Sequence, residues 1–477
     1  MPRVIDGISD KIRSLEAKVK RKPISIVDEV FKLKSSIYFT DEFGTKKPLL
    51  ISVVIPTFIK STQELTGYRS EVLMNALLEL GLLVRKGIID EIIVVDGTNR
   101  YGAIDNRLMR EVISTADHVI PLFHDMIGLI RKYPIVKNQV QLGLFNLVVR
   151  VVHQLDPKIN SAYKKLQIPP HNLSGGKGTA LWLATGIASG DIIVFLDSDV
   201  RNFQRWQATA LMRPILKSWY KSKPIKCVKA YYTRLKVNID WPEKGLYSLG
   251  GRVTRLFVKP LIRILSKYGV LRGLEKLEYP LSGEFAARKE CLESLEFTSN
   301  YSFEMNTLIQ IWRRDMLDQL SQVDLHLFQH FPQRDKDIQE MVMQIAELIV
   351  DELKDSIELD ESIIDEYVEE AMQEIQNTEH LYEKADIRRE VQLEVRRDFV
   401  KDTEGAKRRV EFYAESLKKV IQNSKKNKRK ERIVLPPWNG LSSQKELEFR
   451  AFLKRRAIRS TLELLDKQSL IRLEQLV

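Results

Sequence analysis

The sequence, 477 residues long, is poor in cysteine and has no long hydrophobic run. Its two cysteines, Cys227 and Cys291, are too few for a disulfide framework or for a zinc site with four thiolates. No apolar stretch approaches the roughly 20 residues that a membrane-spanning helix needs. The first residues are charged at short intervals and include no apolar segment of the secretory type. We therefore expect a protein without a transmembrane segment that works in the reducing cytoplasm.

Acidic residues are fewer than basic ones, and the formal net charge is +12. Such a balance favours an anionic ligand, which could be a nucleotide, a phosphorylated metabolite, a nucleic acid or an acidic membrane surface. A hydrophobic content of 44% with 29% charged residues is typical of a globular protein. The length exceeds that of one ordinary domain, so we expect two domains or one domain with a large appendage.

Hydrophobic patterns predict an α/β architecture after a charged, helical leader at residues 1–48. Apolar, β-branched runs predict strands at 49–58, 89–100, 118–123, 191–199 and 225–232, and helical spacing predicts a helix at 69–86. Strands that alternate with helices indicate a mostly parallel sheet. In such sheets ligands bind beyond the carboxyl ends of the strands, where Pro56, Asp96 and the 197–199 triplet lie.

No strand pattern follows residue 335 or so, and the segment 346–477 is predicted to be a helical extension. It contains an acid-rich helix at 347–374, a basic block at 425–432 and a final amphipathic helix at 443–476. The acidic helix is most simply one member of a helical pair with its acids in water. The basic block is most simply a solvated linker, which makes nucleic-acid binding unlikely.

An Asp-Ser-Asp triplet, Asp197-Ser198-Asp199, follows the clearest predicted strand. Two carboxylates separated by one residue on a turn can both reach a shared divalent cation or its ligands. A hard cation such as Mg²⁺ takes oxygen ligands and usually shares them with substrate phosphates. The alternative is a solvated acidic turn, and the position at a strand end favours the metal interpretation.

Two glycine loops could bind anions. Lys177 lies in a Ser-Gly-Gly-Lys-Gly-Thr run before a helix pattern, and Arg252 lies in the run Gly250–Thr254. Glycine lets a backbone approach phosphates closely, and the cations add charge. Each loop taken alone is more simply a surface turn. His330 and Glu304, likewise, are each more often structural residues than ligands when taken alone.

Taken together and in order, these segments resemble the glucosyl-3-phosphoglycerate synthase family of retaining, GT-A-fold glycosyltransferases. The resemblance covers roughly residues 49–345. It is carried by VVDG (94–97), GGKGTALW (175–182), DIIVFLDSD (191–199), VKAYY (228–232), GGRVT (250–254), YPLSGEFAARKECLESLEF (279–297), YSFEMNTLIQIW (301–312) and QVDLHLFQH (322–330). The joint occurrence of LSGE, YSFE and the late histidine is much more specific than any single motif.

The resemblance implies a role for each matching residue. The nucleotide diphosphate of the sugar donor, UDP-glucose or GDP-glucose, would be held by Pro56, Thr57, Asp96, Lys177, Asp197 and Ser198. Mg²⁺ or Mn²⁺ would be coordinated by Asp199 and His330. The acceptor, 3-phospho-D-glycerate, would be held by Gly251, Arg252 and Thr254. Glu304 would position the acceptor hydroxyl or the sugar, and the carbonyl of Leu281 would lie beside the anomeric carbon. The family also implies a homodimer.

Departures from the family pattern leave some choices open. Thr57 and the three residues after it replace an Asn-Glu pair near the nucleotide base, so the base could be uridine or guanosine. Pro332 replaces an acceptor-binding Asn, so the acceptor could be another small phosphorylated acid, and the sugar could be mannose. A helical segment at about 129–172 is interpreted as an insertion. The alternative from another class is a non-catalytic scaffold, which the intact metal and carboxylate constellation argues against.

Overall fold

A computed structural model of the chain describes residues 23–40, 44–58, 68–100, 103–119, 148–237, 247–331, 335–384, 389–426 and 432–464. The main sheet consists of β3 (Ile51–Thr57), β4 (Glu91–Asp96), β7 (Val149–His153), β8 (Ile192–Phe195), β9 (Cys227–Val237), β10 (Tyr247–Leu249), β11 (Phe285–Arg288) and β13 (Leu320–His330). Three short two-stranded sheets are formed by β1 (Tyr38–Thr40) with β2 (Lys46–Pro48), β5 (Asn99–Arg100) with β6 (Ala103–Ile104), and β12 (Phe297–Thr298) with β14 (Val434–Leu435).

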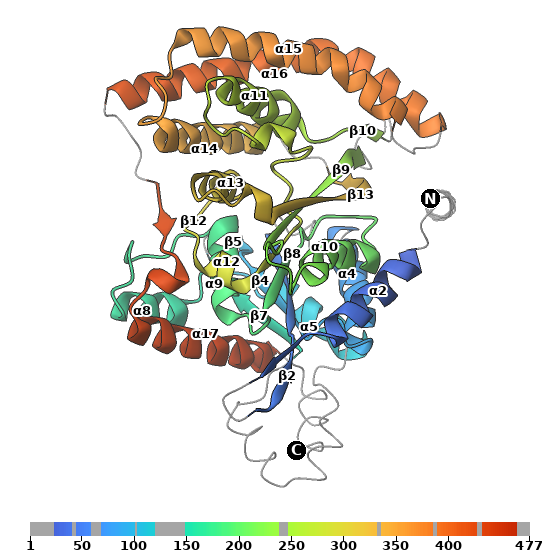
Figure 1. Cartoon of the computed structure of the whole chain (residues 1–477), viewed down its shortest axis with the longest axis vertical. Coiled ribbons are helices and arrows are strands. Elements are labelled where there is room, and N and C mark those ends of the chain that lie inside the picture. Colours follow the sequence, from blue (N-terminus) through green and yellow to red (C-terminus); the bar gives the residue numbers. More distant parts are fainter. Residues whose placement is uncertain are drawn as a thin grey trace.

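The helices lie on both faces of the main sheet and in a separate layer beyond it (Figure 1). Those around the sheet are α2 (Pro23–Ser35), α4 (Tyr68–Arg85), α5 (Arg107–Val119), α8 (Pro157–Lys165), α9 (Lys177–Ile187), α10 (Arg205–Lys217), α12 (Lys289–Glu293), α13 (Phe303–Arg313) and α17 (Ser443–Leu464). The separate layer contains the π-helix η2 (Thr254–Val258), α11 (Lys259–Lys267), α14 (Asp335–Leu353), α15 (Glu361–Lys384) and α16 (Arg389–Lys425). Short 3₁₀ turns are η3 (Leu274–Lys276), η4 (Leu317–Gln319) and η5 (Trp438–Gly440).

The main sheet has the strand order β10-β9-β11-β8-β3-β4-β7, and β13 pairs with β9. Strands β8, β3, β4 and β7 are parallel, and β11 runs antiparallel between β8 and β9. Consecutive side chains of a strand point to opposite faces of the sheet. In β3, Val53 and Ile55 therefore enter one hydrophobic core, while Val54 enters the other. A third core joins η2, α11, α14, α15 and α16. This organisation confirms the predicted α/β class with a mostly parallel sheet.

Several predicted element positions are confirmed and others are corrected. The strands predicted at 49–58, 89–100, 191–199 and 225–232 contain β3, β4, β8 and the start of β9. The strand predicted at 118–123 is wrong at its first two residues, which end α5, and 120–123 lie outside the described residues. In the predicted helical insertion at 129–172, the described part contains β7, which is an edge strand of the main sheet and pairs with β4.

The predicted boundaries at 48 and 345 do not coincide with breaks between the hydrophobic cores. The leader contributes α2, which packs against α10 and supplies Val27 and Val30 to the sheet core. Residue 345 falls inside α14, and the core of the helical layer already begins at Val253. The predicted helix at 443–476 is described as α17, and the rest of that segment lies outside the described residues.

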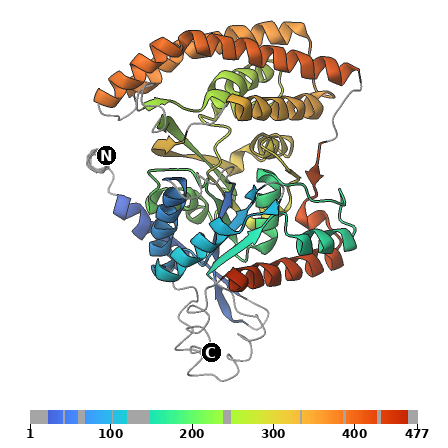
Figure 2. The same cartoon turned by 180° about the vertical axis from the view of Figure 1, so that it is seen from behind.

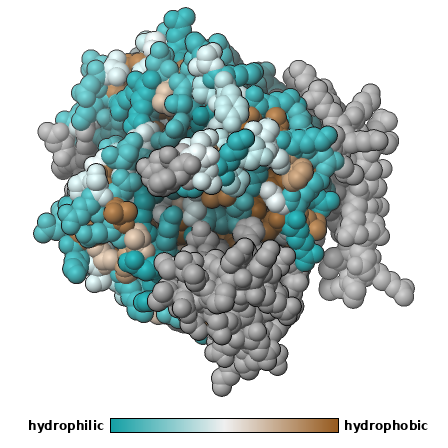
Figure 3. Space-filling view, turned by 60° about the horizontal axis from the view of Figure 1, so that its bottom comes forward, coloured by the Kyte–Doolittle hydropathy of each residue, from teal (hydrophilic) through white to brown (hydrophobic). Residues whose placement is uncertain are grey.

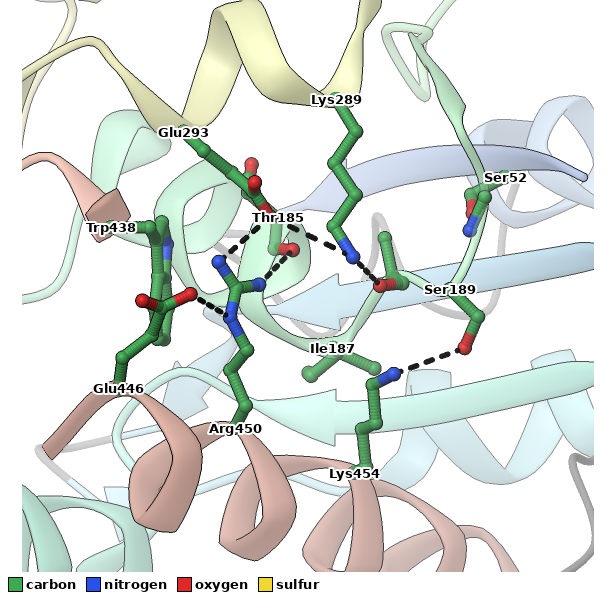
Figure 4. A network of polar contacts seen from close by, with 12 residues as sticks. Ser52, Thr185, Ile187, Ser189, Lys289, Glu293, Trp438, Glu446, Arg450 and Lys454 are labelled. Carbon is green, nitrogen blue, oxygen red and sulfur yellow. Dashed lines mark hydrogen bonds and ion pairs between the residues drawn. The ribbon is translucent and has the colours of Figure 1, made fainter. Parts of the chain in front are cut away.

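The last part of the chain returns to the sheet domain. β14 pairs with β12, and α17 packs against β7, α8 and α9, on the side opposite the helical layer (Figures 1 and 2). Figure 4 shows Arg450 of α17 contacting Glu446 and Thr185, while Lys454 donates to Ser189 at 3.3 Å. The Arg450 guanidinium also pairs with Glu293 at 2.7 Å. The sheet domain is therefore completed by residues more than 250 positions away from α9 in sequence.

We expect the Trp438→Ala variant to lose about 3–5 kcal/mol of unfolding free energy, the usual effect of deleting a large buried aromatic side chain. The Trp438 indole is fully buried and stacks on Trp182, with ring centroids 4.4 Å apart. Gly186 leaves room for it, since a Cβ atom there would lie 2.2 Å from the Trp438 ring. Chemical denaturation measures the loss. Leu447→Ala, which truncates an exposed side chain on α17, is the control and should change stability by less than about 0.5 kcal/mol.

No helix among the described residues is both apolar enough and long enough to cross a bilayer. The face displayed in Figure 3 is largely hydrophilic, and apolar residues are scattered over it. The two cysteines are free and buried, with their sulfur atoms 3.1 Å apart between β9 and α12.

Candidate active site

The carboxyl ends of β3 and β4 bring two predicted donor-binding residues into contact. Thr57 pairs with Asp96 across the parallel strands, and the Thr57 hydroxyl donates to Asp96 Oδ1 at 2.7 Å. The backbone and side chain of Thr98 donate to the same oxygen. Burial raises the pKa of Asp96, although these hydrogen bonds oppose the shift. Its second oxygen, Oδ2, is buried and has no hydrogen-bond partner among the described residues, so this carboxyl group could receive a hydrogen bond from a ligand.

The lysine of the first glycine loop lies between two carboxylates. Lys177 is the first residue of α9, and its Nζ is 2.7 Å from Asp197 Oδ1 and 2.7 Å from Glu304 Oε1. The Lys177 side chain is 17% exposed, so this arrangement is largely removed from water. Burial by itself lowers the pKa of Lys177, but the two carboxylates outweigh it and hold the pKa well above its usual value. The ammonium group is therefore a fixed positive charge beside the acidic turn.

The glycines of this loop are required by packing. A Cβ atom on Gly176 would lie 2.2 Å from the Ser299 carbonyl oxygen, and one on Gly178 would lie 1.7 Å from that of Thr298. Thr179 donates its backbone N–H to the Ser299 carbonyl at 3.2 Å. The start of α9 thus fits against β12 and the residue that follows it. This close approach places Lys177 next to α13, which carries Glu304.

The predicted metal ligands are also adjacent. Asp199 Oδ1 and His330 Nδ1 are 3.2 Å apart, although 131 positions separate them in sequence. Burial raises the pKa of Asp199, but His330, Arg234 and Lys177 together hold it well below its usual range. His330 is fully buried, and its Nε2 has no hydrogen-bond partner among the described residues.

This pair fits a divalent cation. Two ligands of one octahedral Mg²⁺ ion, each bonded at about 2.1 Å, lie about 3 Å apart, which is close to the observed separation. An ionised carboxylate suits Mg²⁺ or Mn²⁺, and a neutral imidazole is a common ligand of divalent metals in general. No group of three or more His, Cys, Asp or Glu side chains arranged to hold a metal occurs among the described residues. The remaining ligands would therefore have to come from a bound molecule or from water.

The LSGE segment packs closely against the acidic turn. A Cβ atom on Gly283 would lie 2.3 Å from Asp197 Oδ2, so only glycine fits beside this carboxylate. Leu281 is half-buried two residues earlier, and the Ser282 carbonyl accepts from Lys229 Nζ at 2.5 Å. The backbone two residues after Leu281 thus lies next to Asp197.

Three further ionisable residues at the site were missed from the sequence: Lys229 and Glu284 are buried, and Arg234 is half-buried. Burial lowers the pKa of Lys229 to about 8, and burial together with Asp197 raises the pKa of Glu284. Burial alone would lower the pKa of Arg234. Tyr279, Tyr232 and Asp199 raise this pKa by a larger amount, so it lies above its usual value. Lys229 and Arg234 both lie on β9. The sequence signal for Lys229 is a cation within an apolar strand. The signal for Glu284 is its position as the last residue of the LSGE motif.

The second glycine loop lies next to the helical layer. Gly251 has a positive φ of 70°, and a Cβ atom there would lie 2.7 Å from the Tyr279 hydroxyl. Arg252 pairs with Asp335 at 2.9 Å, so its guanidinium faces α14 rather than the carboxylates around Lys177. Thr254 is buried at the start of η2. Pro332 lies outside the described residues.

The sheet order, the acidic turn after β8 and the antiparallel β11 define a GT-A-type α/β fold, the fold of a class of nucleotide-sugar transferases. No family model matches the chain. The chain is a sequence relative of curated proteins that are named glucosyl-3-phosphoglycerate synthase, which confirms the resemblance. The protein of that name from Mycobacterium tuberculosis is 36% identical over 163 residues, which is 34% of this chain and 48% of the relative. The one from Petrotoga mobilis is 29% identical over 238 residues, which is 49% of this chain and 68% of the relative.

The chain thus spans about half the length of the mycobacterial relatives that it matches. Among solved structures, it is similar to the M. tuberculosis glucosyl-3-phosphoglycerate synthase in complex with phosphoglyceric acid. The TM-score is 0.46 with 25% identity, covering 68% of this chain and 83% of that one. The same enzyme in complex with Mn²⁺, UDP-glucose and phosphoglyceric acid gives a TM-score of 0.45 and 24% identity, with coverage of 68% and 83%.

Proposed function

We propose that the chain is a metal-dependent retaining glycosyltransferase that moves glucose from a nucleotide diphosphate to 3-phospho-D-glycerate. The observation that carries this proposal is the cluster at the ends of β8 and β13. There the half-buried Lys177 joins Asp197 and Glu304, and Asp199 contacts His330. The sequence relationship to proteins named glucosyl-3-phosphoglycerate synthase supports the choice of glucose and phosphoglycerate.

The donor would bind along the carboxyl ends of β3, β4 and β8. Pro56, Thr57 and Asp96 would contact the nucleoside, and Ser198 would contact the diphosphate together with Asp197 and Lys177. Asp199 and His330 would hold Mg²⁺ or Mn²⁺, which neutralises negative charge on a diphosphate leaving group. The fixed ammonium of Lys177 adds to that stabilisation without reorganisation during the reaction, and such preorganised electrostatic terms are usually the largest in catalysis.

The acceptor would be oriented by the second glycine loop and by Glu304. Gly251, Arg252 and Thr254 would hold its anionic groups, and Glu304 would position its hydroxyl or the sugar. The bond between the anomeric carbon and the diphosphate oxygen breaks, and a bond to the acceptor oxygen forms on the same face. The acceptor proton passes to the departing phosphate oxygen. The Leu281 carbonyl would lie beside the anomeric carbon, where its partial negative charge would favour the positive charge that develops there.

Nucleotide diphosphate release tests this proposal. The wild-type chain is incubated with Mn²⁺ and each of UDP-glucose, GDP-glucose, UDP-mannose and GDP-mannose, with and without 3-phosphoglycerate. We expect release from a glucose donor that depends on both the metal and 3-phosphoglycerate. Release that 3-phosphoglycerate does not stimulate would refute the acceptor, and a preference for mannose would refute the sugar. If no donor is cleaved and none binds in the presence of metal, the chain is a non-catalytic scaffold.

We further propose that the enzyme acts in the cytoplasm as a homodimer. The small number of cysteines, both free and buried, supports a reducing compartment. The family resemblance supports the dimer, and sedimentation at several concentrations would measure it.

A further inference from the structure

A lysine on β9 is buried with little to balance its charge. Lys229 is 3% exposed. Its ammonium group donates to the Ser282 carbonyl at 2.5 Å and lies 5.5 Å from the centre of the Phe285 ring. Within the part of the chain that the structure describes, no ion pair joins this ammonium to a carboxylate, whereas Lys177 of the same site pairs with two. The hydrogen bond to Ser282 is therefore the main polar contact of Lys229.

Such burial is unfavourable for the fold. Moving an ammonium group out of water costs more free energy than one hydrogen bond to a carbonyl contributes. Burial accordingly lowers the pKa of Lys229 to about 8, although three surrounding carboxylates oppose the shift. An apolar residue of similar size would pack at this position without that cost. Stability therefore does not account for the lysine, and functional sites are where such local conflicts are expected.

The hydrogen bond from Lys229 holds one side of a short loop, residues 279–284. Ser282, in the middle of this loop, is fully buried. Its backbone N–H donates to the Tyr279 carbonyl at 3.1 Å, and its hydroxyl donates to the carbonyl and the carboxylate of Glu284, both at 3.1 Å. These partners belong to the loop itself. Of the groups that bind Ser282, the Lys229 ammonium alone comes from another element.

The same loop carries two parts of the proposed active site. Leu281 precedes Ser282, and Gly283 follows it and lies against Asp197. A peptide unit is planar, so the Ser282 carbonyl and the Gly283 N–H turn together. By holding that carbonyl, Lys229 sets the orientation of the peptide that faces the acidic turn. It also limits rotation of the backbone that carries the Leu281 carbonyl.

We propose that Lys229 is a positioning residue of the transfer reaction, whose ammonium holds the Ser282–Gly283 peptide against Asp197 and so keeps the Leu281 carbonyl in place. The inference rests on the proposed function, because that function assigns the roles of Asp197 and Leu281. Lys229 acts through the loop and contacts neither substrate. Its loss should therefore slow turnover without weakening the binding of donor or acceptor.

The test compares Lys229→Met and Lys229→Arg with the wild-type chain. We expect Lys229→Met to lower kcat by about 10- to 100-fold, the usual effect of a small displacement of groups around the reacting atoms. The KM for the sugar donor and for 3-phosphoglycerate should stay within about twofold of the wild type, the pattern of a group that acts in the transition state alone. Lys229→Arg should recover part of kcat, because it keeps a charged donor.

Thermal unfolding separates this role from a structural one. The melting temperature of Lys229→Met should change little, because removing a buried charge offsets the loss of the partner of the Ser282 carbonyl. Lys226→Met is the matched control, since Lys226 directly precedes β9, is 32% exposed and lies 3.9 Å from Glu290. It should behave as the wild type in every measurement.

Two results would overturn the inference. The first is an unchanged kcat in Lys229→Met. The second is a loss of kcat that accompanies a lower melting temperature and that Lys229→Arg does not recover, because Lys229 would then support the fold alone.

Hydrogen exchange followed by mass spectrometry distinguishes a failure of this inference from a failure of the proposed function. In Lys229→Met, the amides of residues 281–285 should exchange about tenfold faster than in the wild type, while those of α17 should be unchanged. Faster exchange in this loop, with no turnover by the wild type, would refute the transferase activity and keep the positioning contact. Wild-type turnover with unchanged exchange in the variant would refute the positioning role and keep the activity.

Discussion

Asp199→Asn should lower kcat/KM for nucleotide diphosphate release by roughly 100- to 1,000-fold, the range seen when one preorganised electrostatic contact to a transition state is removed. The substitution keeps the shape of the side chain and removes the negative charge that pairs with His330 and would bind the cation. His330→Ala should have an effect of similar size, because it removes the other ligand. Steady-state kinetics at several Mn²⁺ concentrations measure both, and the metal concentration needed for half-maximal activity should increase.

The sheet provides a matched control for this pair. Asp324 and His326 lie on the same strand as His330 and are 3.6 Å apart, but both are substantially exposed. Asp324→Asn alters an Asp–His pair without touching the site, so kcat/KM and the metal dependence should stay within about twofold of the wild type. An Asp199→Asn variant with wild-type kinetics would contradict the assigned metal site.

Lys177→Met should lower the unfolding free energy by about 3–5 kcal/mol and abolish measurable transfer. Removing one partner from a buried ion pair leaves an uncompensated charge, and here the ammonium serves both Asp197 and Glu304. Denaturant titration measures the first effect and diphosphate release the second. Because the two carboxylates would then face each other without a cation, adding Glu304→Gln to Lys177→Met should restore part of the stability but none of the activity.

Lys158→Met is the control for Lys177→Met, because Lys158 is a lysine on the surface. Lys158 is largely exposed and is 4.0 Å from Glu463, and such surface pairs contribute about 0–1 kcal/mol. If Lys177→Met were as stable as Lys158→Met, the buried arrangement of Lys177 would be wrong. If it were destabilised yet fully active, the catalytic role of the ammonium would be wrong.

The local parts of the fold were predictable from the sequence because their signal is local. β3, β4 and β8 are short β-branched runs buried on both faces, and each is followed by the turn residues that form the site. β7 was missed since its five residues, Val149–His153, include a charged Arg150. That arginine is fully buried and pairs with Glu91 at 2.6 Å, a compensation that no local pattern reveals.

The site could be predicted only where a motif or the family resemblance connected distant residues. Nothing in the residues alone links Asp199 to His330, and the family pattern supplied that pair. The contact of Lys177 with Glu304 depends on the close packing of β12 against the start of α9. Predicting that packing requires the tertiary structure. The return of Trp438 and α17 to the sheet domain was missed for a similar reason, because a helical pattern does not show which surface will cover its apolar face.

The most direct test of the account identifies the product by proton NMR. The wild-type chain is incubated with Mn²⁺, 3-phosphoglycerate and the α-linked glucose donor that it cleaves, and the anomeric signals are followed over time. Our account predicts one new α-anomeric signal, which grows in step with the released nucleotide diphosphate and belongs to glucose joined to phosphoglycerate. A β-anomeric product would contradict transfer with retention, and free glucose as the main product would contradict transfer to phosphoglycerate.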